Sequence, residues 1–227
     1  MVGYRPERKH RYIYQGKLYE DIAWNDLAEV IEAFHWKINE WYIVPPDGIL
    51  KAGFDQAFSL MALTCMLIDT LSQYYLGKTR STQKTFKDFL KETIPPFDTQ
   101  LPQPIEYTNP RGNPAQLETY ADVLYVGFRC GILHECHIPL YGGLTGQDQL
   151  RGKMFDVDPD ICTKYDDGRD CPTVRMDPTL IYPAVKTVFG QYINDLLTTD
   201  PNFDSRRELF KTKFSASFGE DLTNSKL

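Results

Sequence analysis

The sequence predicts a mainly α-helical fold: a bundle of about five main helices with a small β-hairpin or loop insertion. Apolar residues recur three or four positions apart in several long segments, and prolines follow these segments as helix stops. One stretch, at about 140–176, is rich in Gly, Asp and Pro and predicts the insertion. With 227 residues, 42% hydrophobic and 13% aromatic, the chain can bury a sizeable core without metals or disulfides.

The composition also excludes some functional classes. The formal net charge of -6 argues against a protein that coats nucleic acid by bulk electrostatics, although a local basic groove stays open. The longest charge-free apolar stretch, 57–68, is shorter than the roughly 18 residues that a membrane-spanning helix needs. The chain starts without the apolar region of a secretory signal. We therefore expect a cytoplasmic protein with reduced cysteines and no membrane partner.

The first helix is preceded by a basic segment. Residues 1–20 predict an N-terminal arm or short hairpin that turns at Gln15-Gly16. From Trp24 to Val44, apolar residues recur at helical spacing and Pro45-Pro46 follows, which predicts an amphipathic helix that stops there. The basic residues of the arm are Arg5, Arg8, Lys9 and Arg11, and the apolar residues of the helix are Leu27, Ile31, Phe34, Ile38 and Trp41.

Two further helices are predicted before the middle of the chain. The segment from Gly53 to Leu76 is apolar on nearly all sides, so it should be the central buried helix, with Asp69 as its one acid. A third helix is expected from Ser81 to Ile94, ended by prolines. One side of it carries a row of lysines, which is usually a solvated helix face and is here also the candidate RNA-contacting surface. These lysines are Lys84, Lys87 and Lys91.

The second half of the chain alternates between irregular and helical patterns. Six prolines between 95 and 114 predict a long loop, and Gln116 to Ile138 reads as a fourth helix. A fifth helix should start at Asp177-Pro178, an N-cap followed by proline at the first helical position. We expect the helical domain to cover 21–200.

A short last helix is predicted from Ser205 to Phe218, within a C-terminal segment at 201–227. Phe210, Phe214 and Phe218 repeat every four residues and would dock on the domain. The final Ser225-Lys226-Leu227 matches a peroxisomal address. We treat that match as coincidental, because it matters only in a eukaryote.

The fourth helix carries the candidate catalytic residues. At α-helical spacing, Arg129 and His134 lie about 140° apart on a side of the helix that is otherwise apolar. This side should therefore be covered, in contrast to an ordinary solvated face. Gly127 and Gly131 lower helix propensity and leave a notch that another helix could approach closely. We expect a homodimer built on this face.

An arginine and a histidine together suit phosphoryl-transfer chemistry without a metal. The guanidinium is always charged and matches phosphate oxygens, and the imidazole moves protons near neutral pH. The alternative is structural: an arginine in an ion pair and a hydrogen-bonded histidine. The spacing of Arg129 and His134 alone does not separate the two interpretations.

The run from Arg129 to His134, RCGILH, resembles the Arg-x4-6-His motif of the HEPN superfamily. The earlier segment with Asp69 and the helix after 177 are similar to the helices that flank this motif in the superfamily. The resemblance covers about residues 20–200. It implies a helical bundle that dimerises so that two motifs share one cleft. It also points to a prokaryotic source.

This resemblance implies a function as well. Many members are metal-independent endoribonucleases, often toxins or defence effectors, and others are non-catalytic binding or scaffold domains. By the resemblance, His134 transfers protons as the RNA 2′-hydroxyl attacks the adjacent phosphate, and Arg129 stabilises the developing charge. Asp69, Cys130 and Glu135 are candidate auxiliary residues, although the family commonly has a polar residue where this chain has Cys130. An RNA substrate and an antitoxin or other protein partner are the expected partners.

A metal site is a weaker alternative. In the segment HECH, His134 and His137 could share a helix face, but the zincin pattern His-Glu-x-x-His is one residue longer. The five cysteines contain no C-x-x-C pair. We therefore expect neither a metal nor another cofactor, and two functions stay open, a ribonuclease and a non-catalytic binding domain.

Overall fold

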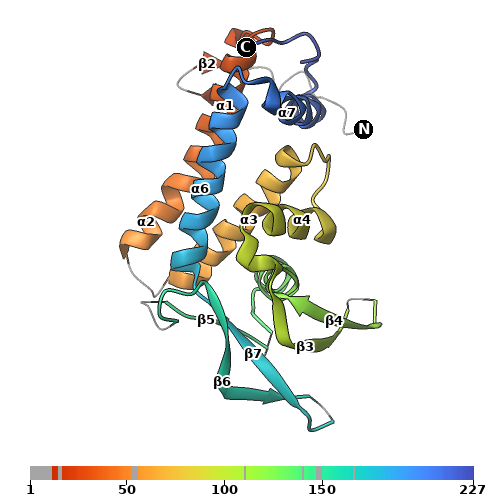
Figure 1. Cartoon of the computed structure of the whole chain (residues 1–227). Coiled ribbons are helices and arrows are strands. Elements are labelled where there is room, and N and C mark those ends of the chain that lie inside the picture. Colours follow the sequence, from red (N-terminus) through yellow and green to blue (C-terminus); the bar gives the residue numbers. More distant parts are fainter. Residues whose placement is uncertain are drawn as a thin grey trace.

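The structure is a computed structural model, and it confirms the mainly helical class. Helices form the body of the molecule, and the sheets of residues 100–119 and 142–176 gather at one end of it (Figure 1). At the start of the chain, β1 (Tyr12–Tyr14) pairs antiparallel with β2 (Lys17–Leu18). The basic residues expected in the arm and the turn at 15–16 lie outside the described residues. The structure describes residues 12–14, 17–52, 56–109, 111–139, 141–146, 150–165 and 167–227.

The first helix continues beyond the predicted stop. After a short 3-10 turn, η2 (Tyr19–Asp21), helix α1 (Leu27–Ile38) is capped by Asp26. The chain then passes through a π-helix, η3 (Asn39–Ile43), into α2 (Val44–Ala52). The expected end at Pro45-Pro46 is therefore wrong. Both prolines lie in the first turn of α2, directly after the wider turn of the π-helix η3, so the chain stays helical through them with a change of helix type.

Helix α3 (Ala57–Tyr75) is the centre of the fold, as predicted, and packs against the helices of residues 83–93, 124–135, 178–197 and 204–218. Helix α4 (Gln83–Thr93) starts at Thr82, whose hydroxyl accepts the N–H of Thr85 at 3.2 Å. The burial of α3 is not complete on all sides, because Phe58 and Met66 are 40% and 38% exposed. None of the described helices has the length and hydropathy needed to cross a bilayer.

The long loop predicted at 95–114 is a β-hairpin instead. A 3-10 turn, η5 (Pro95–Asp98), leads into β3 (Gln100–Thr108), which pairs antiparallel with β4 (Pro114–Thr119). The pairing is interrupted between Gln100 and Ile105, and Pro102 and Pro104 lie in that interruption. Prolines are tolerated there because a bulge does not require their N–H in the ladder.

The fourth helix starts later than predicted, and most of it is not an α-helix. Residues 116–119 belong to β4, and α5 (Tyr120–Val123) begins after a capping box in which Thr119 and Asp122 bond to each other's backbone. A π-helix, η6 (Leu124–Glu135), follows directly. It ends at Cys136, which adopts a left-handed conformation with φ 56°.

The predicted insertion contains a hairpin and one additional strand. Strand β6 (Phe155–Lys164) pairs antiparallel with β7 (Asp170–Met176), and β5 (Gly142–Leu144) runs parallel to β7 on its other side. Helix α6 (Pro178–Leu197) follows, with Asp177 as its N-cap as predicted. The β6–β7 hairpin and the β3–β4 hairpin lie at the same end of the helical body (Figure 1).

The C-terminal helix docks on the core at the opposite end (Figure 1). A short turn, η7 (Pro201–Phe203), precedes α7 (Asp204–Phe218). Phe210 and Phe214 are buried, and the Phe210 ring lies 5.3 Å from the ring of Phe34 in α1. The C-terminal residues bond to the start of α1: the Leu27 N–H donates to the carbonyl of Lys226 at 2.9 Å. Ser225, in the same tripeptide, is buried.

Candidate functional site

Arg129 and His134 contact each other on one side of η6. The Arg129 Nη1 lies 2.6 Å from the His134 Nε2. The predicted separation of about 140° is wrong because it assumed α-helical geometry. In a π-helix, hydrogen bonds join residue i to residue i+5, so side chains five positions apart lie on the same side of the helix. The structure thus brings the two predicted catalytic residues together.

Asp69, in the neighbouring helix α3, holds the Arg129 side chain in place. The Arg129 Nε donates to the Asp69 Oδ2 at 2.8 Å, and the Ser81 hydroxyl donates to the other oxygen of Asp69. The side chains of Arg129 and Asp69 are only 17% and 14% exposed. Burial is the largest single influence and lowers the pKa of Arg129, but the charge and hydrogen bond of Asp69, together with the contacts to Cys130 and Tyr125, outweigh it, so the net pKa lies above its ordinary value. Arg129 is therefore a permanent, positioned cation.

The contact with Arg129 defines the state of His134. A guanidinium has only donors, so the His134 Nε2 must be the accepting, unprotonated nitrogen of a neutral imidazole. Such a nitrogen can take up a proton. His134 is exposed, and the Arg129 Nη2 has no hydrogen-bond partner among the described residues. The Arg129 Nη2 therefore remains available as a donor beside an exposed imidazole.

The other residues of the motif contribute less. The Cys130 thiol lies 3.9 Å from the Arg129 Nη1, which is a weak contact. Glu135 does not face His134; its carboxylate lies 3.6 Å from the Nε2 of His137. The two histidines of HECH therefore have different partners. Within the described part of the chain, no group of three or more His, Cys, Asp or Glu side chains is arranged to hold a metal ion.

The two glycines of η6 serve the chain itself. A Cβ on Gly131 would lie 2.5 Å from the carbonyl oxygen of His137, and one on Gly127 would lie 3.1 Å from the ring of Tyr141. The expectation that this notch receives another helix is wrong. It receives the segment 137–141, which folds back along η6 after the left-handed residue Cys136.

The lysine row of α4 is engaged in ion pairs. Lys84 bonds to Asp88 at 2.6 Å, and Lys91 bonds to Asp98 at 2.8 Å. Lys87 bonds to the buried Asp122 of the capping box. Each ammonium group therefore has a carboxylate beside it, and the row adds little net positive charge to this surface.

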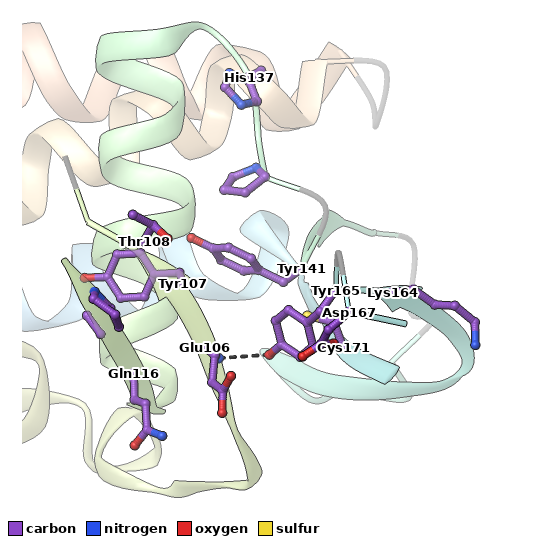
Figure 2. A pocket seen from close by; sticks show the side chains of 13 residues that line it. Glu106, Tyr107, Thr108, Gln116, His137, Tyr141, Lys164, Tyr165, Asp167 and Cys171 are labelled. Atoms are coloured by element: carbon purple, nitrogen blue, oxygen red, sulfur yellow. Dashed lines mark hydrogen bonds between the residues drawn. The ribbon is translucent and has the colours of Figure 1, made fainter. Parts of the chain in front are cut away.

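A cleft of about 930 Å³ lies beside η6, and the sequence did not reveal it. Its walls are the β3–β4 hairpin, the segment that follows η6, and the β6–β7 hairpin (Figure 2). Tyr107, Tyr141 and Tyr165 line it. Tyr107 lies in the segment 95–114, for which the sequence predicts a loop, and Tyr141 and Tyr165 lie in the predicted insertion at about 140–176, so no pattern in the sequence places the three together. The alternation of Ile105 and Tyr107 with the exposed Glu106 and Thr108 along β3 is the signal that could have identified the strand.

Comparisons with protein-family models, with curated proteins and with solved structures find no significant match to this chain. We therefore infer the site from its geometry and from the RCGILH motif at 129–134.

Proposed function

We propose that this chain is a metal-independent endoribonuclease of HEPN type, in which Arg129 and His134 act on single-stranded RNA. The observation that carries the proposal is the 2.6 Å contact between the Arg129 guanidinium and the His134 imidazole, with the arginine anchored by Asp69. A fixed cation beside a neutral imidazole is the combination that attack of a 2′-hydroxyl on a phosphodiester requires.

In this mechanism, the phosphate of the substrate bonds to the open edge of Arg129, and its 2′-hydroxyl lies at His134. In the free chain the Arg129 Nη1 donates to the one lone pair of the His134 Nε2. When the phosphate takes over that donor, the Nε2 is released and accepts the hydroxyl proton while the 2′-oxygen forms a bond to phosphorus. The bond from phosphorus to the 5′-oxygen breaks, and that oxygen takes a proton. The products are a 2′,3′-cyclic phosphate and a free 5′-hydroxyl. Arg129 stabilises the charge that develops on the phosphate oxygens.

The proton for the leaving oxygen is best supplied by a second copy of the chain. In a homodimer with both motifs in one cleft, the partner's His134 gives up its own Arg129 contact, takes a proton from solvent and donates that proton to the leaving oxygen. Phe58 and Met66 support such an interface, because they are exposed apolar residues on the side of α3 that also carries Asp69. The lysines of α4 have no part in this mechanism.

The proposal is tested by cleavage of single-stranded RNA in EDTA at low salt, because the acidic chain attracts RNA only weakly. Wild-type protein should cleave. His134→Ala should lose activity by about 10²–10⁴-fold, the usual effect of removing a general acid or base. Arg129→Ala should be similarly impaired. His35→Ala, an exposed histidine on α1, should cleave like the wild type.

All variants must match the wild type in circular dichroism and in oligomeric state. Equal cleavage by wild type, His134→Ala and Arg129→Ala would identify a contaminant and end the nuclease proposal. No cleavage of any RNA by the wild type would favour the non-catalytic binding domain.

A further inference from the structure

The hairpin cleft, lined by Tyr107, Tyr141 and Tyr165, has the size of a small-molecule site. Its volume of about 930 Å³ lies near the upper end of the range that ligand pockets usually have. The three rings come from three different parts of the chain: β3, the segment before β5, and the residue after β6. Figure 2 shows the Tyr141 side chain directed from its segment toward the β3–β4 hairpin that carries Tyr107.

The tyrosines offer ring surface and unused hydroxyl groups. All three are half-buried, which leaves part of each ring accessible in the cleft. The hydroxyls of Tyr107 and Tyr141 have no hydrogen-bond partner among the described residues. Burial raises the pKa of both phenols, so they stay neutral donors at physiological pH. A planar ligand could therefore stack and also accept hydrogen bonds.

The walls of the cleft are connected before any ligand binds. The Tyr165 hydroxyl accepts the backbone N–H of Glu106 at 2.8 Å (Figure 2). The Glu106 carboxylate receives both terminal nitrogens of Arg169, at 2.7 and 3.3 Å. Arg169 also bonds to Asp167 at 2.7 Å. These contacts join the two hairpins, so little ordering is required on binding.

The charges in the cleft do not select a phosphate. Glu106 and Asp167 share Arg169, and the exposed Lys164 lies 3.3 Å from Asp170. With acids and bases paired in this way, the cleft lacks the cationic surplus that binds a phosphate backbone. Its recognition chemistry is that of stacking and neutral hydrogen bonds.

The cleft adjoins the Arg129–His134 pair. The Tyr141 ring packs at Gly127 of η6, and the His137 carbonyl packs at Gly131. The Cys130 thiol, 3.9 Å from the Arg129 Nη1, also lies close enough to Tyr107 and Tyr141 to contribute to the raised pKa of each phenol. The segment 137–141 thus forms a wall of the cleft and also the cover of the helix that carries the pair.

We propose that the hairpin cleft binds a nucleobase of single-stranded RNA, stacked on Tyr107 and Tyr141, while Arg129 holds the neighbouring phosphate. This inference rests on the proposed nuclease function and adds the determinant of substrate class. Stacking accepts every base, because each base has a π-face. The enzyme should therefore prefer unpaired RNA without a strong sequence requirement, since a paired base cannot enter the cleft.

The test separates binding from cleavage. The probe is a single-stranded RNA hexanucleotide with one 2-aminopurine base. All its riboses carry 2′-O-methyl groups, so the strand has no free 2′-hydroxyl and cannot be cleaved. Stacking on tyrosine should quench its fluorescence. Tyr107→Leu and Tyr141→Leu should each weaken binding by about 5- to 100-fold, the effect of losing one base–aromatic stack.

Controls distinguish stacking from folding. Tyr107→Phe and Tyr141→Phe keep the rings and should bind within about threefold of the wild type, as expected when a single neutral hydrogen bond is lost. Trp41→Leu removes an exposed aromatic residue on η3, outside the cleft, and should bind as the wild type does.

Wild-type affinity in both leucine variants, or no binding of the probe to wild-type protein, would overturn the inference. Cleavage of ordinary RNA by these leucine variants at wild-type kcat and KM would overturn it too, and would leave the nuclease proposal intact. Binding of the probe by a protein that cleaves no RNA would support the cleft and contradict the nuclease.

Discussion

Arg129 links two other side chains, and each link serves a different purpose. Its Nε bond to Asp69 fixes the guanidinium, and its Nη1 bond to His134 sets which imidazole nitrogen is unprotonated. The neighbouring Cys130 adds only a weak sulfur contact in place of the polar residue common in the HEPN motif. Asp69 is therefore the residue whose loss should most disturb the pair without removing it.

Asp69→Asn tests this role at the level of a single residue. The substitution removes the carboxylate that anchors Arg129, so the free energy of unfolding should fall by about 1–2 kcal/mol, less than for a fully buried ion pair. RNA cleavage should decrease because the guanidinium loses its position. Urea denaturation and cleavage kinetics measure the two effects.

The matched control is Asp88→Asn. Asp88 pairs with Lys84 on the surface of α4, where both side chains are well exposed, so stability should change by less than about 0.5 kcal/mol. If Asp69→Asn behaves like this control in both stability and activity, Asp69 does not anchor the site.

The element that builds the site is the π-helix η6. Its i→i+5 pattern aligns Arg129 with His134, and its two glycines admit the segment that forms one wall of the hairpin cleft. An α-helix of the same sequence would separate the pair. The geometry of the site therefore depends on the π-helical form of η6.

Gly131→Ala should disturb this element. Its new Cβ would meet the backbone carbonyl of His137 at 2.5 Å, so the returning segment must move, at a cost of about 1–3 kcal/mol. Thermal unfolding should show a lower Tm, and binding of the 2-aminopurine probe should weaken.

Gly190→Ala is the control for Gly131→Ala. Gly190 lies in α6 with nothing within 4 Å of a new Cβ, so the substitution should stabilise the protein by about 0.5–1 kcal/mol. Equal and favourable effects of both substitutions would mean that Gly131 is not a close-approach site.

The start of the fourth helix should be sensitive to acid. Burial raises the pKa of Asp122, but its bonds to Lys87 and Thr119 lower it more, so the net pKa lies below its ordinary value. A lowered folded-state pKa gives stability that is present above the unfolded-state pKa and lost as pH falls through the folded-state pKa.

In Asp122→Asn, the free energy of unfolding at neutral pH should be lower than in the wild type by about 0.5–2 kcal/mol, as for loss of a helix cap. The difference should narrow below about pH 4, where Asp122 of the unfolded state becomes protonated, and be lost as pH falls through the lower folded-state pKa. Denaturation across this pH range checks it. A difference that stays constant would rule out the titration of Asp122 as its cause.

Comparison of sequence and structure shows which features are local. Helices α3, α4, α6 and α7 were predictable, because apolar spacing and caps such as Asp177 encode them directly. The β3–β4 hairpin was not, since Pro102 and Pro104 argue against a strand until the interruption in its register is known. The pair of Arg129 and His134 was identified by motif, but its contact depends on the π-helix, which periodicity does not reveal.

The proposed mechanism needs a homodimer, because two copies of the Arg129–His134 pair share one cleft. Light scattering at micromolar concentration should give the mass of two chains. Met66→Lys should shift the protein toward monomer and reduce RNA cleavage, because it places a charge on the exposed apolar side of α3. Leu209→Lys, an exposed apolar residue on α7, is the control and should leave the mass unchanged. A wild-type monomer that cleaves RNA would contradict the shared cleft.

The proposed uptake of the 2′-hydroxyl proton by His134 can be tested with one substrate. The substrate is a DNA strand that contains a single ribonucleotide, incubated in EDTA. We expect the wild type to cleave only after that ribonucleotide and to leave a 2′,3′-cyclic phosphate on it. His134→Ala should not cleave this substrate. Cleavage of an all-deoxy strand, or cleavage at the ribonucleotide that persists in His134→Ala, would contradict the account.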